Sequence, residues 1–360
     1  MRGATDDVVR AALASSDPLP GTTGFAGELD GTLVRDVLGR EPLFIEGALS
    51  GGPMPDWSHK PTELADPELF PAGCVRDSEG ERTVWTLPDP EPFDDRATAT
   101  ERVRGAVEMS VDSVDTDGLA IAFSGGVDSA LLAARLDAPL YVTGFPESHD
   151  VEAARSAADL LDRELRVVEL THDAIERAVP EIAAATGRTD AMSVQIALPL
   201  YLTAERVAAD GFDRLALGQG ADELFGGYAK VEKAPDDPRV EADTVRGAQR
   251  EVIATLPDQL PRDVLALWAA GVEPVTPLLH DRVVSVALRL DDRMLVDGET
   301  RKWALRQAAL HSLPESIAMR DKKAAQYGSL AARELDRLAR QAGYKRRMDD
   351  HVTKYIESLL

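Results

Sequence analysis

A short segment rich in serine and glycine is the part of the chain best suited to chemistry. Residues 124–129 read Ser-Gly-Gly-Val-Asp-Ser and come directly after the apolar run Leu119 to Phe123. Glycines let a phosphate approach the backbone, whose free N–H groups bind it where a helix begins. The two serines add hydroxyl donors, and Asp128 is suited to hold the Mg²⁺ that accompanies a triphosphate. The segment therefore predicts a phosphate-binding loop.

A second segment places two carboxylates among glycines. Residues 218–228 read Gly-Gln-Gly-Ala-Asp-Glu-Leu-Phe-Gly-Gly-Tyr and follow the apolar run Leu215 to Leu217. Asp222 and Glu223 beside glycine turns, at the carboxyl end of a strand, suit a metal–pyrophosphate site. A basic loop, residues 320–323, must face something anionic in a protein of net charge −23, unless Lys322 and Lys323 only flank a helix.

The elements that would position these segments alternate between strand and helix from about residue 98. Strands separated by helices of this length indicate parallel pairing with crossover helices, and so an α/β fold with a parallel sheet and flanking helices. The expected strands are Leu119 to Phe123, Leu140 to Thr143, Leu165 to Leu170 and Arg214 to Leu217. The expected helices are Asp128 to Leu136, Val151 to Leu161, Ala174 to Ala185 and Ser193 to Ala209.

The two ends of the chain differ from this middle part. Short apolar stretches in the first ninety residues, such as Gly31 to Val37, Pro42 to Ile45 and Thr83 to Leu87, alternate with Gly, Pro and Asp and predict strands and turns. Pro88 to Phe93 is a linker candidate. The last 120 or so residues read as almost all helix. We therefore expect a small β-rich domain over 1–92 and a second domain over 93–360. The C-terminal helices are expected at Asp243 to Thr255, Arg262 to Ala270, Asp281 to Leu290, Thr300 to Leu310, Ser329 to Gln341 and Asp350 to Leu360.

Residues 124–129 resemble the SGGxDS loop of the ATP pyrophosphatases, which release pyrophosphate from ATP and leave an adenylate. No Gly-Lys-Ser/Thr follows, so the loop is not a Walker A loop. Residues 218–228 resemble the G-x-G-[SA]-D-E-x-F-G-G-Y stretch of asparagine synthetase and its lactam-forming relatives. NAD synthetases and thiolation enzymes lack this second block, and thiolation also needs more cysteines than this chain has. The resemblance is therefore to the asparagine synthetase family.

The resemblance implies a set of site residues. Shorter matches follow in the family's order at residues 144–150, 199–202, 271–279, 302–306 and 320–323. The implied ATP-binding residues are Phe123, Ser124, Gly125, Gly126, Val127, Asp128, Ser129, Thr143, Leu217 and Gly218. Asp128 and Asp222 are the implied Mg²⁺ ligands, and Lys322, Glu223 and Gln219 the implied catalytic residues. Lys322 would neutralise charge on the phosphates and on the acyl-transfer transition state.

The N-terminal part resembles the class II glutaminase domain more faintly. Residues 35–44 are similar to its RD-x₂-G-x₂-PL[YF] strand pair, and residues 70–73 to its FPAG turn. That domain uses an N-terminal cysteine as nucleophile. Residue 2 here is arginine, and Cys74 follows the FPAG turn, where the family has no nucleophile. We expect a truncated remnant that braces the second domain and performs no catalysis of its own.

Gln219 is a departure inside the implied site. The family has glutamate there, which the resemblance links to deprotonation of ammonia or of the intermediate it forms. A glutamine can orient an amine but cannot accept a proton at pH 7. Leu217 likewise replaces a serine that touches the nucleotide in the family.

The function expected is an ATP-dependent amide-forming ligase that activates a carboxylate as an acyl-adenylate and uses ammonia. Asparagine synthesis from aspartate is the first reading. The alternatives are a related adenylating ligase with a different acid or amine, and a catalytically silent nucleotide-binding protein. The substrates implied are ATP, an amino acid and ammonia. The sequence leaves the oligomeric state open, a homodimer included.

Composition indicates the environment in which the protein works and the partners that it is not expected to have. Apolar residues make up 44% of the 360 residues, and no long apolar run or apolar N-terminal segment is present, so neither a membrane span nor a secretory signal is expected. One cysteine excludes a disulfide framework, and the cytoplasm is the default location. The charge of −23 argues against nucleic-acid binding. The basic residues are 8 Lys and 32 Arg, 40 together. Excess carboxylate with scarce lysine predicts a halophilic protein, and an ordinary acidic cytosolic protein is the alternative.

Overall fold

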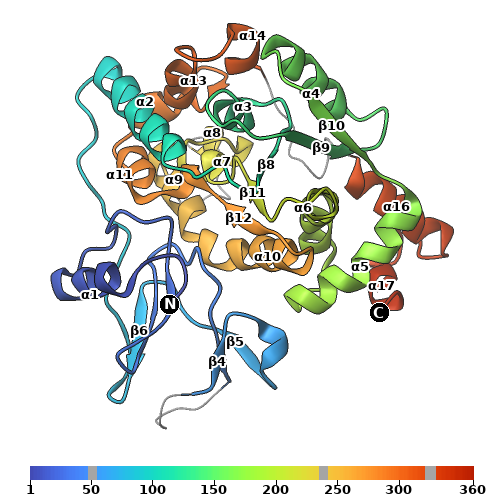
Figure 1. Ribbon diagram of the computed structural model, residues 1–360, viewed down its shortest axis with the longest axis horizontal. Helices are drawn as coiled ribbons and strands as arrows, with labels where there is room; N and C mark the ends of the chain where they lie inside the picture. The colour runs from blue at the N-terminus through green and yellow to red at the C-terminus, as the bar shows by residue number, and fades with distance from the viewer. Residues whose placement is uncertain (48–54, 235–241, 321–329) are drawn as a thin grey trace. The chain divides into compact units, whose positions relative to one another are not determined.

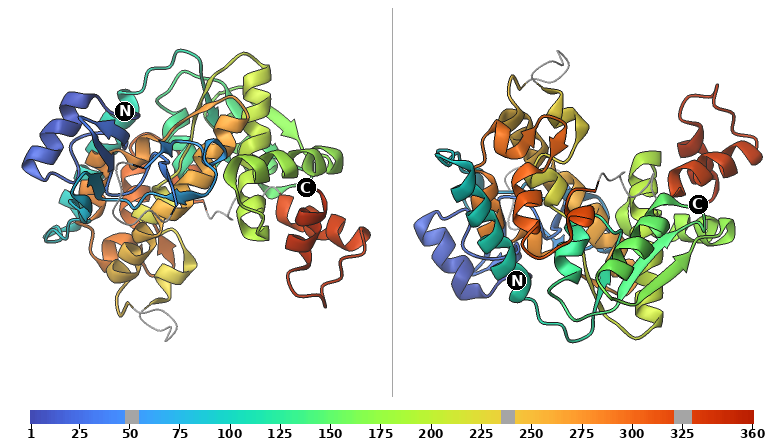
Figure 2. Two further views of the ribbon diagram at one scale, coloured as in Figure 1. Left: turned by 90° about the horizontal axis from the view of Figure 1, so that it is seen from below. Right: turned by 90° about the horizontal axis from the view of Figure 1, so that it is seen from above.

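The computed structural model describes residues 1–47, 55–234, 242–320 and 330–360. Many of its elements are labelled in Figure 1, and Figure 2 shows the chain from two further sides. The chain forms two compact units, which are described one after the other. The first unit comprises residues 1–114, 218–261 and 276–312, and the second comprises residues 115–217, 262–275 and 313–360.

A five-stranded parallel sheet forms the centre of the second unit. Its strands lie in the order β10-β9-β8-β11-β12. Four of them confirm the predicted strands, and β12 was not predicted. Pro274 lies inside β12, and an edge strand that pairs on one side only can hold a proline. The bounds are β8 Leu119–Ala122, β9 Leu140–Gly144, β10 Leu165–Glu169, β11 Arg214–Ala216 and β12 Glu273–Val275.

Helices cover this sheet, which confirms the predicted α/β class. Leu119, Ala120 and Ile121 of β8 are all buried, as expected of a parallel strand with both faces covered. Helices α4 and α6 both pack against β9. Side chains cap the longer helices: Ser148 accepts from the Val151 N–H at the start of α4. The helices are α3 Val127–Ala133, α4 His149–Leu160, α5 His172–Thr186, α6 Ala191–Ala209, α14 Glu315–Ala318, α16 Ala331–Gln341 and α17 His351–Ser358.

The N-terminal part of the first unit is rich in strands, as predicted. Two small antiparallel sheets run in the orders β1-β2-β6-β7 and β4-β3-β5. Helix α1 (Asp6–Ser15) was not predicted. Its Val9 and Ala12 are three positions apart and are both buried, so they lie on the face that packs against the rest of the unit. The predicted strand at 83–87 was wrong beyond Thr83, where β7 ends. The strands are β1 Ala26–Leu29, β2 Thr32–Arg35, β3 Phe44–Glu46, β4 Trp57–Ser58, β5 Pro67–Leu69, β6 Cys74–Asp77 and β7 Gly80–Thr83, with a 3-10 turn η1 at Pro61–Glu63.

The rest of the first unit is almost all helical. The helix predicted from Thr300 begins instead at Trp303, because Gly298 and Lys302 both have positive φ and a two-stranded hairpin forms between them. None of the helices in the described ranges is long and apolar enough to span a membrane. The elements are α2 Arg96–Asp112, α7 Ala221–Leu224, α8 Ala229–Glu232, α9 Val245–Ala254, η3 Pro277–Leu279, α11 Asp281–Ala287, α12 Asp292–Leu295, β13 Val296–Asp297, β14 Thr300–Arg301 and α13 Trp303–Ala309, while α10 (Leu256–Ala269) has residues in both units.

Candidate functional site

The strand order of the second unit defines where a ligand is expected. From β8 the chain adds β9 and then β10 on one side, and it adds β11 and then β12 on the other. The order therefore reverses between β8 and β11. In open parallel sheets, ligands bind beyond the carboxyl ends of the strands at such a reversal point. The loop after β8 contains residues 124–129, and Leu217 follows β11.

The loop after β8 is closely fitted to its surroundings. Gly125 has φ +72°, and a Cβ there would lie 2.4 Å from the carbonyl oxygen of Ala153 in α4. No other residue could take this conformation in this space without strain. The Ser124 N–H donates to Ser129 Oγ at 3.2 Å, and Ser129 Oγ donates to the Gly126 oxygen at 3.3 Å. Serine hydroxyls thus hold the loop in shape.

Three further predicted residues line the same region of the sheet. Phe123 is buried, and its N–H donates to the Tyr141 oxygen at 2.7 Å. Asp128 lies in the first turn of α3 and is only 1% exposed. Thr143, at the end of β9, places its hydroxyl 2.5 Å from that of Thr203 in α6. Thr143 therefore lies near the carboxyl end of its strand, as predicted, and its hydroxyl is bonded to another side chain of the protein.

Leu217 continues the sheet beyond β11, because its N–H donates to the Val275 oxygen at 2.9 Å. Its side chain is buried in a cluster of apolar residues. The residue that replaces the family's serine therefore belongs to the core. Gly218 and Gln219 come next in the chain and are half-buried.

In the first unit, Asp222 and Glu223 lie in α7, a helix of one turn. Gly220 precedes it with φ +95°, a conformation that favours glycine. The Gly227 N–H donates to the Asp222 carbonyl at 2.8 Å. Gln249 in α9, fully buried, donates through Nε2 to the Leu224 carbonyl at the end of α7. These bonds hold the helix from its C-terminal side, which restricts where its carboxylates can point.

Lys302 brings a positive charge to these carboxylates. Its Nζ atom lies 2.6 Å from Asp222 Oδ1, and its side chain is 5% exposed. Gly227 passes directly over this pair, since a Cβ there would lie 2.0 Å from Asp222 Oδ1 and 2.5 Å from Lys302 Cε. The neighbouring Arg301 donates to the Gly227 carbonyl at 2.9 Å. The hairpin β13–β14 is therefore bonded to the glycine turn through Arg301.

Glu223 is held in a different environment from Asp222. It is 8% exposed, and burial, together with the nearby Asp222 carboxylate, raises its pKa. The Tyr228 hydroxyl donates to Glu223 Oε1 at 2.5 Å and, with Lys302, opposes that rise. Two adjacent carboxylates thus have separate partners, a lysine for one and a tyrosine for the other.

The sequence did not predict Lys302 or Tyr228 as site residues, although both lie in segments that resemble the family, residues 302–306 and 218–228. Lys322, predicted to be catalytic, lies outside the described residues. Arg320, just before it, donates to the Ala153 carbonyl at 2.8 Å and to Ser156 Oγ at 3.2 Å. This arginine therefore attaches the start of the basic loop to α4, next to Gly125.

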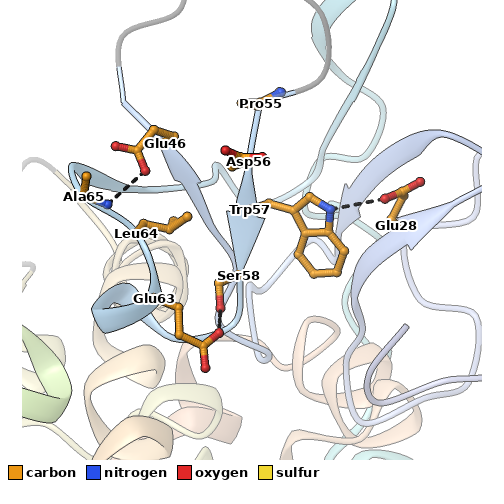
Figure 3. A pocket seen from close by; sticks show the side chains of 9 residues that line it. All are labelled: Glu28, Glu46, Pro55, Asp56, Trp57, Ser58, Glu63, Leu64 and Ala65. Atoms are coloured by element: carbon orange, nitrogen blue, oxygen red, sulfur yellow. Dashed lines mark hydrogen bonds between the residues drawn. The ribbon is translucent and has the colours of Figure 1, made fainter.

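A hollow of about 760 Å³ lies in the N-terminal β-rich part (Figure 3). Two of its carboxylates accept hydrogen bonds from neighbouring side chains: Glu28 from Trp57 Nε1 at 3.2 Å, and Glu63 from Ser58 Oγ at 2.5 Å. Such an acidic lining would repel a triphosphate. Cys74 is not among the lining residues and is itself buried on β6. None of the residues predicted to bind ATP lines this hollow.

Comparisons with known proteins agree with the sequence-based resemblance. The family model described as asparagine synthase matches residues 99–265 and 236–356. A relative from Methanocaldococcus jannaschii, named as a glutamine-hydrolyzing asparagine synthetase, is 32% identical over 279 residues, which cover 68% of this chain and 51% of that protein. Asparagine synthetase B (glutamine-hydrolyzing) of Escherichia coli is 28% identical over 71% of this chain and 50% of its own length.

The chain spans about half the length of these curated relatives. Among solved structures, an NMN synthetase from Francisella tularensis matches 74% of this chain and 93% of its own, with a TM-score of 0.35 and 12% identity. A similarity of that size carries no argument about function. The family model alone covers well over half of the sequence, and the chain therefore belongs to the asparagine synthase family.

Proposed function

We propose that the chain is an ATP-dependent amide-forming ligase that activates a carboxylate as an acyl-adenylate and transfers the acyl group to ammonia. Asparagine synthesis from aspartate is the reaction proposed first, because the relatives named above are asparagine synthetases. The observation that carries the proposal is the serine–glycine loop after β8, at the point where the strand order reverses.

The chemistry divides into two steps. In the first, a carboxylate oxygen of the acid attacks the α-phosphorus of ATP, the bond to the bridging oxygen breaks, and pyrophosphate leaves. In the second, the amine attacks the acyl carbon, AMP leaves, and the amine gives up a proton. The loop residues 124–129 would bind the phosphates, and Lys322 would stabilise charge in both steps. Glu223 is proposed as a catalytic carboxylate of the second step.

The residues present fit a Mg²⁺ ion bound together with phosphates. Within the described ranges, no three His, Cys, Asp or Glu side chains converge on one metal position. Mg²⁺ does not require such a cage, since it usually takes one or two carboxylates and completes its shell with phosphate oxygens and water. The Asp222 side chain, 36% exposed, is accessible enough for this role. Asp222 is proposed as a ligand on this ground, and Asp128, which is 1% exposed, is proposed on the SGGxDS resemblance alone. The ion would supply charge neutralisation on the triphosphate.

Gln219 favours a second candidate function. A glutamine cannot accept the proton that the attacking amine must lose. A related adenylating ligase, with another acid or another amine, would suit a site that reads its substrate by hydrogen bonds from an amide. This candidate shares the first step with asparagine synthesis and differs only in the acceptor or the acid.

The N-terminal part, over residues 1–92, is proposed to be a degenerate glutaminase-like domain without catalysis of its own, joined to the synthetase domain over 93–360. Its single cysteine supports this, because Cys74 is buried on β6 with Sγ 3.5 Å from Thr83 Oγ1. A nucleophilic thiol has to be accessible to substrate. Ammonia, rather than glutamine, is therefore the proposed nitrogen source for this chain.

The decisive experiment is a pyrophosphate-release assay with ATP, Mg²⁺, ammonium and a panel of amino acids. Aspartate-dependent pyrophosphate release with asparagine formation supports the first reaction. Release with another acid favours the second candidate, and nucleotide binding with no release would indicate a catalytically silent protein. Asp128→Ala and Asp222→Ala are expected to abolish release while leaving the fold intact, and Asp159→Ala, an exposed carboxylate on α4, is the control.

A further inference from the structure

Arg40 lies in the N-terminal β-rich part, and its side chain bonds to residues of the first unit that come much later in the chain. Its side chain is 2% exposed, and its guanidinium donates to Asp36 Oδ1 at 2.8 Å and to Asp281 Oδ1 at 2.7 Å. It also donates to the carbonyl oxygen of Leu279 at 2.8 Å. A buried guanidinium between two carboxylates is fixed in place, because any shift would leave charges uncompensated. Arg40 therefore joins the N-terminal part to the segment 277–281.

Asp281 strengthens the same connection. Its Oδ2 accepts from the backbone N–H groups of Gly21 and Thr22, at 2.9 and 2.7 Å. The Thr22 carbonyl in turn accepts from the Asp281 N–H at 2.8 Å. The last residue of η3 and the first residue of α11 are thus both bonded to the N-terminal part, Leu279 through its carbonyl and Asp281 through its side chain and backbone. The position of Leu279 is set by residues that precede it by more than two hundred positions.

The side chain of Leu279 packs against Gly220. A Cβ on Gly220 would lie 2.6 Å from Leu279 Cδ2 and 2.7 Å from its Cγ, so the two residues are already in van der Waals contact. Gly220 also has φ +95° and directly follows Gln219. A glycine backbone in this conformation has no side chain of its own to hold it. The wall formed by Leu279 therefore limits where the Gly-Gln-Gly turn can lie.

We propose that Arg40 is a positioning residue for the Gly-Gln-Gly turn at 218–220, acting through Leu279. The inference rests on the proposed function for its consequence in catalysis, since Gln219 is the residue assigned to the amine. In this proposal the N-terminal part helps to position residues 218–220, a role that requires no glutaminase activity. The first step of the reaction depends on it less, because Asp222 is held separately by Lys302 and by the Gly227 N–H.

Two variants test the connection at different points. Arg40→Lys keeps the charge but cannot make all three of the hydrogen bonds of the guanidinium. Leu279→Ala removes the wall against Gly220 and leaves the carbonyl that Arg40 binds. Arg35→Lys is the matched control: Arg35 is as deeply buried in the same part of the chain, and it donates to the carbonyls of Gly39, Glu41, Phe70 and Pro257, none of them in the segment 277–281.

Two readouts are measured on the full chain. Hydrogen exchange of the amides at 219–226 should accelerate by about tenfold in Arg40→Lys and in Leu279→Ala, and should remain near wild type in Arg35→Lys. The KM for ammonium in amide formation should rise roughly ten- to a hundredfold in the first two variants, since a misplacement of about 1 Å can cost that much. ATP–pyrophosphate exchange should change by less than about threefold.

The inference is overturned if both variants fold and exchange these amides at the wild-type rate, or if Arg35→Lys shows the same acceleration. If the wild-type protein forms no amide with any acid tested, the proposed function fails alone. The hydrogen-exchange comparison then still decides whether Arg40 positions the turn.

Discussion

The Nζ atom of Lys302, the residue directly before α13, lies 2.6 Å from Oδ1 of Asp222 in α7. The lysine is almost fully buried, whereas more than a third of the aspartate side chain is exposed. The carboxylate therefore has a protein cation against Oδ1 and is still partly accessible to solvent. Such an arrangement holds the aspartate in one orientation before any ligand arrives, which is what a metal-binding carboxylate requires.

This pair should behave as one unit in pyrophosphate release. Asp222→Ala is expected to lower ATP–pyrophosphate exchange by about 10² or more, and Lys302→Met by about tenfold. The double variant should be no slower than Asp222→Ala alone, because the lysine acts through the aspartate. Lys233→Met, an exposed lysine of the same unit, is the control. Fully additive losses in the double variant would show that the two residues act independently.

Glutamine should not serve as nitrogen source. The chain has one cysteine, and it is buried on a strand. Purified protein is expected to release no glutamate from glutamine, and Cys74→Ala should leave ammonium-dependent amide formation within about twofold of wild type. The measurement is glutamate release followed beside amide formation in the same preparation. Glutamate release that disappears in Cys74→Ala would assign the thiol a catalytic role and contradict the proposal.

Salt should stabilise the protein. The 63 carboxylates outnumber the 40 lysine and arginine side chains, so repulsion weakens the folded state at low ionic strength. Between about 0.1 M and 2 M KCl the Debye length falls from about 10 Å to below about 3 Å, and the melting temperature should rise by about 5 °C or more. Sucrose is the control, because it stabilises by exclusion without screening charge. A melting temperature that does not change with KCl would refute the halophilic reading.

Gln219→Glu should separate the two steps of the reaction. A glutamate can take the proton that the amine loses, and a missing general base typically costs about 10² to 10⁴ in rate. The substitution is therefore expected to raise ammonia-dependent amide formation and to leave ATP–pyrophosphate exchange almost unchanged. Both are measured side by side in the two proteins. A lower rate of amide formation in Gln219→Glu would instead identify Gln219 as a substrate-reading residue and favour the second candidate function.

Most of what the sequence determined is local in the chain. The loop after β8 was predicted because its glycines, its serines and the preceding apolar run are neighbours, and each acts through its own backbone conformation. Alternation of apolar runs with helical patterns predicted the parallel sheet, since a buried parallel strand is a short continuous apolar run and an amphipathic helix repeats about every 3.6 residues. Strand β12 was not predicted, because three residues that include a proline form neither an apolar run nor a helical pattern. Only their pairing with β11 makes them a strand.

The tertiary structure decided which distant residues meet. The neighbour relation between β8 and β11, which creates the reversal point, depends on how whole elements cover one another's apolar faces. The meeting of Lys302 with Asp222, and of Arg40 with a carbonyl 239 positions away, follows from packing and has no period or spacing in the sequence. Local conformation is encoded by adjacent residues. A buried charge and its partner come together only in the folded chain, because it is the packing of distant segments that brings the two groups together and excludes water from both.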